Sequence, residues 1–504
     1  MFTKLKSAAP IGLDCKAVEV EVDINKGQTN FSIVGLPDIS IQEAKSRIYS
    51  AIKNSGFDYP FNFRVLVNLA PADLHKEGPA YDLPMAVGTL SVSYGYFFEL
   101  DDSLMVGELA LDGSLRHTNS ILPLAIFAKQ NKIKKIFVPA CDAPEAALVE
   151  GLEIYPVNSL RQIMNHFTGQ ELIEVYQKNY DDDESWEITS EFDMSLVKGQ
   201  EFVKRALEIA ASGGHNILMS GPPGSGKTLL ARTLPTILPK LNRDEALEVT
   251  KIYSVAGLLE NGFIKLRPFR SPHHTASGVS LVGGGKYPRP GEISLAHRGV
   301  LFLDEFPEFP RTVLENLRQP LEDGTITISR AQGTLAFPAR FILVASQNPC
   351  PCGFSSDPDK QCSCTQQQIM RYQKKVSGPL LDRIDLHIEV PRINFDKLSS
   401  TENGESSKSI RQRVEQARQI QTKRFTNSSI QTNSEMSNAE LQKFCRLDES
   451  SLLLLKTAVT QMHLSARAYN RILKLARTIS DLAGEENISQ NHIAEALQFR
   501  QKEG

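Results

Sequence analysis

The spacing of apolar and polar positions divides the chain into segments of different kinds. Residues 1–170 alternate apolar runs of strand length with stretches of helical period, which predicts an α/β domain. Residues 192–395 repeat a simpler order, in which short, continuously apolar runs are separated by helical stretches. Continuously apolar strands are typical of a parallel sheet that helices cover on both faces. Residues 410–504 have a mostly helical pattern and are expected to form a small α-helical lid.

Polar stretches without an apolar period separate these segments. Residues 171–191 contain the acidic run DDDES at 181–185, which is typical of a solvated linker. Residues 396–409 are rich in Ser, Thr, Asn and Glu, and we expect a flexible linker there. The similar composition of residues 426–435 predicts a second mobile stretch.

The length of 504 residues agrees with several domains, because a single hydrophobic core stops growing at about 250–300 residues. No apolar run approaches the roughly 18 residues of a membrane span, and the N-terminal residues lack the apolar region of a secretory signal. We therefore expect a cytoplasmic protein without a membrane partner. The formal net charge of −3 neither favours nor excludes DNA, since a few cations lining a channel would barely change it.

The first candidate site lies between an expected strand at residues 217–219 and an expected helix at residues 227–238. The sequence between them matches the phosphate-binding pattern G-x-x-x-x-G-K-[ST] at every position. Its residues are Gly221, Pro222, Pro223, Gly224, Ser225, Gly226, Lys227 and Thr228. The glycines let backbone N–H groups turn towards phosphates, the lysine would reach the β and γ phosphates, and the threonine hydroxyl would bind Mg²⁺. ATP and Mg²⁺ are therefore the expected cofactors.

A pair of carboxylates follows the apolar run at residues 300–303. Asp304 and Glu305 would lie at the carboxyl end of that strand, the edge where ligands bind in open α/β sheets. We expect Asp304 to hold Mg²⁺ through water and Glu305 to polarise the attacking water. Alone, such a pair is often only a strand end that meets a loop, but the phosphate-binding loop favours the catalytic interpretation.

Two further polar residues are candidates for hydrolysis. Asn348 follows the expected strand at residues 341–346, so its amide could orient water beside the γ-phosphate, or it could only cap a turn. Phosphoryl transfer also needs a cation at the transition state, often an arginine from a neighbouring subunit. Arg383 lies between Asp382 and Asp385, where composition alone favours a surface salt bridge.

Four of the seven cysteines form two C-x-C pairs in one short stretch. They are Cys350, Cys352, Cys362 and Cys364. Four thiolates suit tetrahedral Zn²⁺, and the cytosol favours metal binding over a disulfide. The pairs are tighter than the usual C-x₂-C spacing, so free thiols in a loop and a redox role remain alternatives.

Longer strings are more specific than the nucleotide motifs. They are FRSPHHTAS at 269–277, LVGGG at 281–285, PGEISLAH at 290–297, QNPCPCG at 347–353 and SARAYNR at 465–471. With the nucleotide motifs, these strings resemble the ComM/YifB family, the magnesium-chelatase-like branch of AAA+ ATPases, over nearly the whole chain. The resemblance implies an AAA+ parallel-sheet core followed by a helical lid.

The resemblance also gives roles to arginines. It implies that Arg383 is a finger acting in trans on the nucleotide of a neighbouring subunit. It places the second sensor of the γ-phosphate at Arg467, with Arg471 one helical turn away as the alternative. A finger acting in trans needs a neighbour at every site, so the resemblance implies a homohexameric ring.

Two insertions would line the central pore of such a ring. One runs from residue 269 to about 296, and the other is a β-hairpin at residues 324–341, where polar and apolar residues alternate. Lys286, Arg289 and Arg330 could contact the phosphates of threaded DNA, or could be ordinary surface residues. Proteins similar to this one are implicated in DNA branch migration during natural transformation, so we expect a DNA helicase.

Residues 61–160 resemble the proteolytic domain of Lon-type proteases. The nucleophile position falls on Ala80, and the position of the general-base lysine falls on Arg116. Alanine offers no nucleophile, and a guanidinium group cannot act as a base near neutral pH. We therefore expect no protease activity, and ring assembly and DNA contact remain open as roles of residues 1–170.

The nucleotide motifs also agree with two other functions. An AAA+ remodeller of a protein partner, or a chelatase-type ATPase, would carry the same ATP site. A chelatase subunit is not expected to carry the first domain or the cysteine cluster, so it is less favoured. An inactive scaffold disagrees with the complete set of nucleotide motifs.

Overall fold

The chain forms two compact units. The computed structural model describes residues 2–177, 191–259, 262–285, 288–330, 333–357, 360–392, 404–426, 428, 430–462 and 464–500. The first unit comprises Met1–Trp186 and Ala246–Ile264, and the second comprises Glu187–Glu245 and Lys265–Gly504. The acidic run predicted as a linker, residues 181–185, lies outside the described residues. None of the helices in the described part of the chain is long and apolar enough to cross a membrane.

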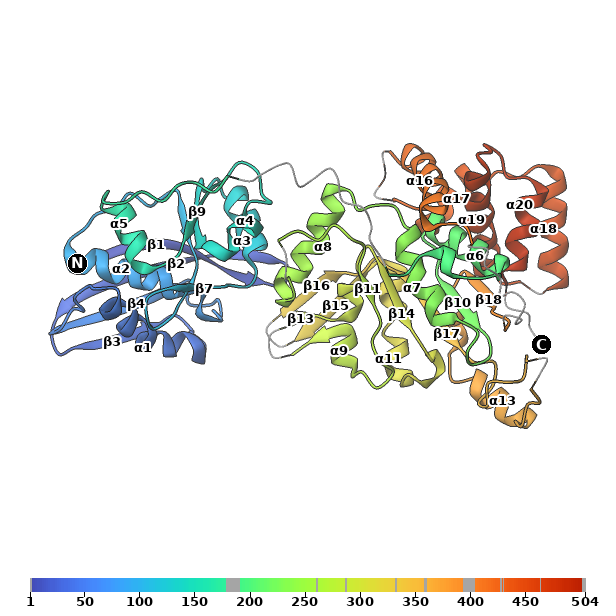
Figure 1. The fold of residues 1–504 in the computed structure, drawn as a ribbon, viewed down its shortest axis with the longest axis horizontal. Helices are drawn as coiled ribbons and strands as arrows, with labels where there is room; N and C mark the ends of the chain where they lie inside the picture. Colours follow the sequence, from blue (N-terminus) through green and yellow to red (C-terminus); the bar gives the residue numbers. More distant parts are fainter. Residues whose placement is uncertain are drawn as a thin grey trace. The chain divides into compact units, whose positions relative to one another are not determined.

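The first unit is built on two sheets, which are drawn in blue to cyan in Figure 1. A mixed sheet has the order β1-β2-β4-β3, and a parallel sheet has the order β5-β8-β9. Their strands are β1 (Phe2–Ile11), β2 (Asp14–Lys26), β3 (Asn30–Val34), β4 (Phe63–Ala70), β5 (Ser103–Met105), β8 (Lys135–Pro139) and β9 (Glu153–Val157). The short strands β6 (Glu108–Leu109) and β7 (Leu115–Arg116) pair with each other.

Helices fill the space around these sheets. They are α1 (Ile39–Asn54), α2 (Asp82–Tyr94), α3 (Ile121–Gln130), α4 (Ala143–Ala146) and α5 (Leu160–Phe167). Helix α2 is buried on all sides from Asp82 to Val92, because its apolar residues do not keep to one face and the helix lies inside the unit. The α/β prediction for this part of the chain is confirmed.

The second unit contains a five-stranded parallel sheet of order β11-β14-β17-β10-β18. Its strands are β11 (Phe269–Arg270), β14 (Val300–Leu303), β17 (Ile342–Gln347), β10 (Ile217–Ser220) and β18 (Leu386–Glu389). All four residues of β14 are buried, as a strand covered on both faces requires. The predicted parallel sheet is confirmed, and β11 belongs to it, so the first predicted insertion begins only after Arg270.

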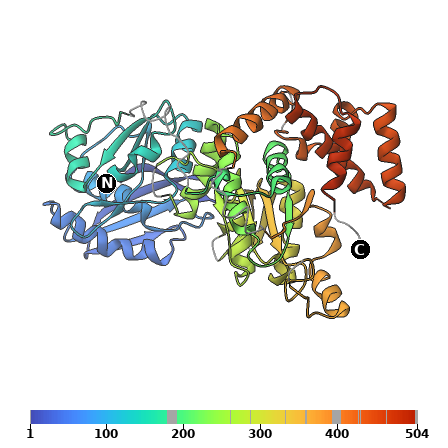
Figure 2. The same ribbon diagram turned by 45° about the vertical axis from the view of Figure 1, so that its right-hand side comes forward.

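One hydrophobic core joins this sheet to the C-terminal helices, which appear in orange and red in Figures 1 and 2. The long helices that lie wholly or partly in the unit are α6 (Glu201–Gly213), α7 (Lys227–Ile237), α8 (Arg243–Ala256), α13 (Gln366–Gln373), α16 (Ser407–Arg424), α18 (Glu449–Gln461), α19 (Ala466–Ala483) and α20 (Gln490–Gln498). The shorter ones are α9 (Gly278–Val282), α10 (Glu292–Leu295), α11 (Arg311–Glu315), α12 (Arg318–Asp323), α14 (Gly378–Leu381) and α17 (Asn438–Phe444). The predicted helical C-terminal region is thereby confirmed. Helix α8 contains the boundary between the two units, after Glu245.

Two predicted polar stretches differ from expectation. Helix α16 begins at Ser407 rather than at residue 410, because the hydroxyl of Ser406 accepts a hydrogen bond from the N–H of Ser409 and caps the helix. The expected mobility of residues 426–435 is wrong at their C-terminal end. There Asn433 is fully buried and its amide donates to Asp481 at 2.8 Å. A polar segment that is bonded to a buried carboxylate is fixed in place.

Two small hairpins extend from the sheet. Strands β12 (Gly283–Gly284) and β13 (Arg289–Pro290) pair with each other, as do β15 (Thr325–Arg330) and β16 (Gly333–Pro338). The predicted hairpin at residues 324–341 is therefore present. A Cβ atom on Gly283 would come within 3.0 Å of Ile328, so the two hairpins pack directly against each other.

Candidate nucleotide site

The phosphate-binding loop connects β10 to α7. Gly224 and Gly226 have φ angles of +78° and +87°, the left-handed region that glycine adopts at little cost. The ammonium group of Lys227 donates to the carbonyl oxygens of Gly221 and Pro222, at 2.7 and 2.9 Å. Burial lowers the pKa of Lys227, and the negative charge of Asp304 opposes that shift. The loop thus holds a desolvated cation whose present partners are neutral.

The carboxylate of Asp304 lies beside this loop. Its Oδ2 accepts a hydrogen bond from the Thr228 hydroxyl at 3.1 Å, and its Oδ1 accepts from Ser346. Ser346 is brought there because β14 and β17 are parallel neighbours, with Leu303 opposite Ala345. The two oxygen groups that were expected to hold Mg²⁺ are therefore adjacent, and oxygen ligands are the ones this ion prefers.

Glu305 and Asn348 face the same cavity of about 390 Å³, which the phosphate-binding loop, Asp304 and Ser346 also line. The Oδ1 atom of Asn348 lies 3.4 Å from the Lys227 ammonium group. Glu305 has a φ of +52°, an uncommon backbone conformation for a residue other than glycine, and such strain is typical of functional sites. The structure therefore brings the expected carboxylates, amide and lysine together.

His274 is a neighbour of Glu305 that was not among the residues predicted for the site. Its Nδ1 atom lies 3.2 Å from Glu305 Oε2, and its ring packs against His273 at 4.1 Å between centroids. His274 belongs to the string at 269–277 that follows the edge strand β11. The order of the strands in the sheet decides this contact, and spacing along the sequence does not reveal it.

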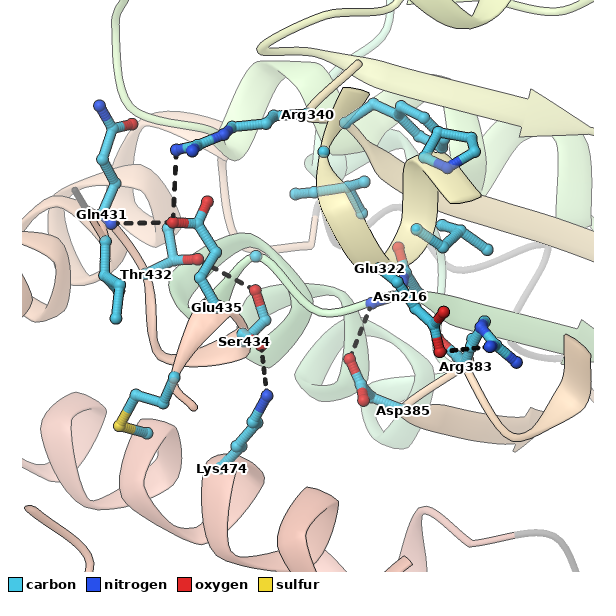
Figure 3. A pocket seen from close by; sticks show the side chains of 18 of the residues that line it. Asn216, Glu322, Arg340, Arg383, Asp385, Gln431, Thr432, Ser434, Glu435 and Lys474 are labelled. Atoms are coloured by element: carbon cyan, nitrogen blue, oxygen red, sulfur yellow. Dashed lines mark hydrogen bonds and ion pairs between the residues drawn. The ribbon is translucent and has the colours of Figure 1, made fainter. Parts of the chain in front are cut away.

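The candidate arginines lie elsewhere in the second unit. Arg383, Arg467 and Arg471 line a cavity of about 650 Å³, part of which is shown in Figure 3. The described residues that line the cavity of the phosphate-binding loop include no arginine. Arg467 and Arg471 lie one turn apart at the start of α19, which the hydroxyl of Ser465 caps. Within one chain, the expected catalytic residues therefore line two different cavities.

Arg383 forms an ion pair, but not with either of the acids beside it in the sequence. Its guanidinium group contacts Glu322, as Figure 3 shows, and donates to the carbonyl oxygen of Pro379. Asp382 instead lies 3.2 Å from Arg471, and Asp385 lies 3.2 Å from His215. The surface salt bridge suggested by composition is thus formed with a distant residue.

The four clustered cysteines come together in space. Their sulfur atoms all lie within 4.8 Å of one another. The Cys350 sulfur lies 3.4 Å from that of Cys352 and 3.7 Å from that of Cys362. The backbone N–H of Phe354 lowers the pKa of Cys352 to about 5. Four sulfurs bound to zinc at about 2.3 Å would be about 3.8 Å apart, so the arrangement fits the metal.

The cysteine cluster packs against the phosphate-binding loop. A Cβ atom on Gly353, which lies between the two cysteine pairs, would come within 2.6 Å of Pro223 in that loop. The same atom would lie 3.9 Å from the Asn348 side chain. The cluster and the nucleotide cavity therefore share a wall.

The residues expected to contact DNA are described only in part. Arg289 is exposed and lies in β13, whereas Lys286 and the side chain of Arg330 fall outside the described residues. The backbone of Arg330 ends β15, opposite Gly333. The observed positions therefore place Arg289 on one hairpin and Arg330 at the end of the other.

In the first unit, Ala80 lies in a 3₁₀ turn, Pro79–Tyr81, at the start of α2. Its carbonyl oxygen accepts a hydrogen bond from the N–H of Gly107 at 2.8 Å. Arg116 is mostly exposed and lies opposite Glu108, the residue that follows Gly107. The two positions where a Lon-type dyad was expected are thus close together, with an alanine and an arginine in them.

Family comparisons match three stretches of the chain. "Magnesium chelatase, subunit ChlI" matches residues 193–398, "Subunit ChlI of Mg-chelatase" matches residues 20–142, and "Magnesium chelatase, subunit ChlI C-terminal" matches residues 404–500.

Individual relatives cover nearly the whole chain. The competence protein ComM of Haemophilus influenzae is 43% identical over 98% of this chain and 96% of its own length. The uncharacterised protein YifB of Escherichia coli is 42% identical over the same shares. The 38 kDa magnesium-chelatase subunit of Rhodobacter capsulatus is 30% identical, over 31% of this chain and 50% of its own length. With the parallel sheet, the phosphate-binding loop and the helical C-terminal region described above, these similarities show that the chain belongs to the ComM/YifB family of magnesium-chelatase-like AAA+ proteins.

Proposed function

We propose that the chain is an ATPase whose subunits assemble into a homohexameric ring that moves along DNA. The observation that carries the proposal is the division of the hydrolysis residues. The loop, the carboxylates and Asn348 line one cavity, and the arginines line another. A second copy of the chain that presents its arginine cavity to the phosphate-binding loop would complete the site, and repetition of that contact would close a ring.

Each residue of the first cavity has a defined task in hydrolysis. Lys227 exchanges its two carbonyl partners for the β and γ phosphates of ATP, and Asn348 orients the attacking water. Glu305 polarises that water as the general base. Mg²⁺, held by Thr228 and through water by Asp304, would neutralise charge on the phosphates.

The arginines act on the nucleotide of the neighbouring subunit. Arg383 is the finger that stabilises the charge of the transition state, and Arg467 contacts the γ-phosphate, with Arg471 as the alternative. Arg471 already donates to the carbonyl oxygen of Ile384 at 2.8 Å and lies beside Asp382, whereas Arg467 is exposed. This difference favours Arg467 as the residue that reaches a ligand.

DNA is the proposed substrate of the motor, and single-stranded or branched DNA is threaded through the ring. The two hairpins pack on each other and carry Arg289 and Arg330, while Lys286 lies in the connection between β12 and β13. Arg289 is exposed on β13, and an exposed cation beside a pore suits a phosphate backbone. A relative that is named a competence protein supports this choice over a protein substrate. We therefore propose helicase activity in branch migration and recombination during natural transformation.

Zinc is the proposed ligand of the four cysteines. The observed sulfur–sulfur distances of 3.4 to 3.7 Å match a tetrahedral site better than they match a disulfide, whose sulfur atoms are about 2.05 Å apart. Bound zinc would fix the conformation of this loop, and Gly353 would transmit that rigidity to Pro223 and Asn348. The reduced thiols that this requires agree with the cytoplasm as the location of the protein.

We also propose that the first unit has the fold of a Lon-type protease but no protease activity. Its role is ring assembly or DNA contact. Ala80 and Arg116 occupy the two positions that would need a nucleophile and a base. Incubation of the purified protein with unfolded casein, ATP and Mg²⁺ tests this. Cleavage that disappears after substitution of a residue in the first unit would contradict it.

The deciding experiment measures ATP hydrolysis with and without single-stranded DNA, and then the conversion of branched DNA in the presence of ATP and Mg²⁺. We expect DNA to stimulate hydrolysis and branched DNA to be converted only when ATP is present. An ATPase that ignores DNA and leaves branched DNA unchanged would contradict the proposal. That outcome would favour a remodeller of a protein partner or a chelatase-type ATPase.

A further inference from the structure

A short helix connects the proposed DNA hairpin to the proposed arginine finger. Helix α12 is followed by Gly324, and β15 of the hairpin begins at the next residue. The amide of Gln319 in α12 donates to the hydroxyl of Thr327 in β15 at 3.3 Å. The base of the hairpin is closed by the N–H of Ala339, which donates to the carbonyl oxygen of Gly324 at 2.8 Å. The base of the hairpin is therefore joined to α12 by the chain itself and by one side-chain hydrogen bond.

The same helix makes two side-chain contacts with the segment that carries the finger. Arg318 donates to the hydroxyl of Ser377 at 3.2 Å, just before α14. Glu322, one turn further along α12, forms the ion pair with Arg383 that is marked by a dashed line in Figure 3. Both ends of α12 are thus bonded to the segment of residues 377–383.

Both terminal nitrogens of the Arg383 guanidinium group already have an acceptor in the described part of the chain. One terminal nitrogen contacts Glu322, and the other donates to the carbonyl oxygen of Pro379. The remaining nitrogen, Nε, is buried and has no hydrogen-bond partner in the described part of the chain. A phosphate that accepts two parallel N–H groups of Arg383 therefore competes with these acceptors, and of the two only Glu322 is charged.

We propose that Glu322 is a positioning residue that restrains the arginine finger until DNA binds the hairpin. The inference rests on the proposed function, because it assumes that Arg383 is the finger and that the hairpin contacts DNA. When DNA displaces β15, α12 moves with the hairpin and the carboxylate of Glu322 leaves the guanidinium group. Arg383 then turns towards the phosphate of the neighbouring subunit. Half of the Glu322 side chain is exposed, so the ion pair is weak enough for substrate binding to break it.

The restraint predicts a specific change in ATP hydrolysis. Glu322→Gln keeps the size of the side chain but removes its charge, so ATP hydrolysis without DNA should rise about three- to fivefold. Stimulation by DNA should shrink by a similar factor, because the finger is already free. Asp323→Asn is the matched control, since it removes a carboxylate from the next position of the same helix and should leave both rates unchanged.

A double variant tests whether the effect passes through the finger. Glu322→Gln combined with Arg383→Ala should hydrolyse ATP as slowly as Arg383→Ala alone. The proposal is overturned if Glu322→Gln hydrolyses ATP at or below the wild-type rate without DNA, if Asp323→Asn shows the same rise, or if the rise persists in the double variant. Circular dichroism and gel filtration check that the variants fold and assemble. A wild-type protein that ignores DNA would contradict the proposed function, whereas the comparison without DNA would still decide the role of Glu322.

Discussion

The ammonium group of Lys227 is the cation that a nucleotide would meet first. Its carbonyl partners are neutral, and burial lowers its pKa. A bound polyphosphate supplies the negative charge that is missing there, because ionic partners form hydrogen bonds about twice as strong as neutral ones. At the scale of single residues, a bound nucleotide would thus offset the electrostatic cost of burying the Lys227 ammonium group.

Two substitutions separate binding from hydrolysis. Lys227→Ala removes the cation and should abolish or sharply weaken nucleotide binding, measured with a fluorescent ATP analogue. Glu305→Gln should bind the analogue normally but hydrolyse ATP at least about 100-fold more slowly, because the attacking water loses its base. A Glu305→Gln protein that turns over ATP at the parent rate would show that another group is the base.

The residues that could be predicted from the sequence lie in contiguous motifs, in which neighbouring residues form the site together. The loop at 221–228 needs only its own backbone and the following helix to define its shape, so its pattern predicted it. Ser346, His274 and Glu322 could not be assigned in this way. Each meets its partner only because of the order of strands or the packing of a short helix, and one sequence carries no local sign of these contacts.

At the scale of elements, a buried polar network holds the helices of the C-terminal region together. Asp481 of α19 is buried and accepts hydrogen bonds from Arg424 of α16, Asn433 and Arg477. The sequence predicted the helices around this network from their apolar period. It gave a mobile stretch at residues 426–435 because Ser, Thr and Asn are also the residues of loops.

Removal of this carboxylate should destabilise the region strongly. Asp481→Ala leaves two buried guanidinium groups without an anion, which typically costs about 3–5 kcal/mol. Thermal unfolding followed by circular dichroism, with hydrogen exchange to locate the change, would measure the loss. Glu449→Ala, which changes an exposed residue of α18, is the control and should change the free energy of unfolding by less than about 0.5 kcal/mol. Equal stability of the two variants would show that the network contributes little.

The cysteine loop allows a second test at this scale. Protein purified without chelators should contain about one zinc per chain, measured by elemental analysis, and Cys350→Ser with Cys362→Ser should contain none. Loss of the metal should also weaken nucleotide binding, because Gly353 packs on Pro223. Substitution of Cys15, a thiol of the first unit that belongs to no group able to hold a metal in the described part of the chain, is the control. Wild-type protein that is fully active without bound metal would contradict the zinc proposal. The four cysteines would then be free thiols in a loop.

At the scale of the whole molecule, a split site makes the subunits depend on each other. Arg383→Ala should bind ATP normally and lose hydrolysis, because the affected residue serves the neighbouring nucleotide. A mixture of Arg383→Ala with Lys227→Ala should recover part of the activity. In the mixture, a Lys227→Ala subunit can present its intact Arg383 to the intact phosphate-binding loop of an Arg383→Ala neighbour. ATP hydrolysis of the mixture is compared with the sum of the two separate variants. Two affinity tags verify that the rings contain both variants. If such mixed rings remain inactive, the finger does not act in trans.

The pore cations should affect DNA without affecting the nucleotide site. Replacement of Lys286, Arg289 and Arg330 by Ala should weaken DNA binding and strand displacement, while DNA-independent ATP hydrolysis stays nearly unchanged. The salt dependence of DNA binding should fall, by up to about three units of its logarithmic slope if each residue contacts one phosphate.

Three exposed lysines far from the hairpins in the sequence provide the comparison for this triple variant. They are Lys408, Lys443 and Lys456. Their replacement by Ala changes the net charge equally and should leave DNA affinity and strand displacement unchanged. Equal losses in both triple variants would mean that overall charge, rather than contacts in a pore, governs binding.

Residues 246–264, which leave the second unit to complete the first, have a consequence for synthesis of the chain on the ribosome. Leu247 and Phe263 pack on the core formed by Ala8, Leu104 and neighbouring residues, so that core is unfinished when residue 186 emerges. Domains generally fold in order from the N-terminus during translation. Here the first unit must wait until residue 264 has left the exit tunnel, by which time the phosphate-binding loop is already outside. The nascent chain therefore exposes an apolar surface for the time needed to add these residues, when chaperones would be most needed.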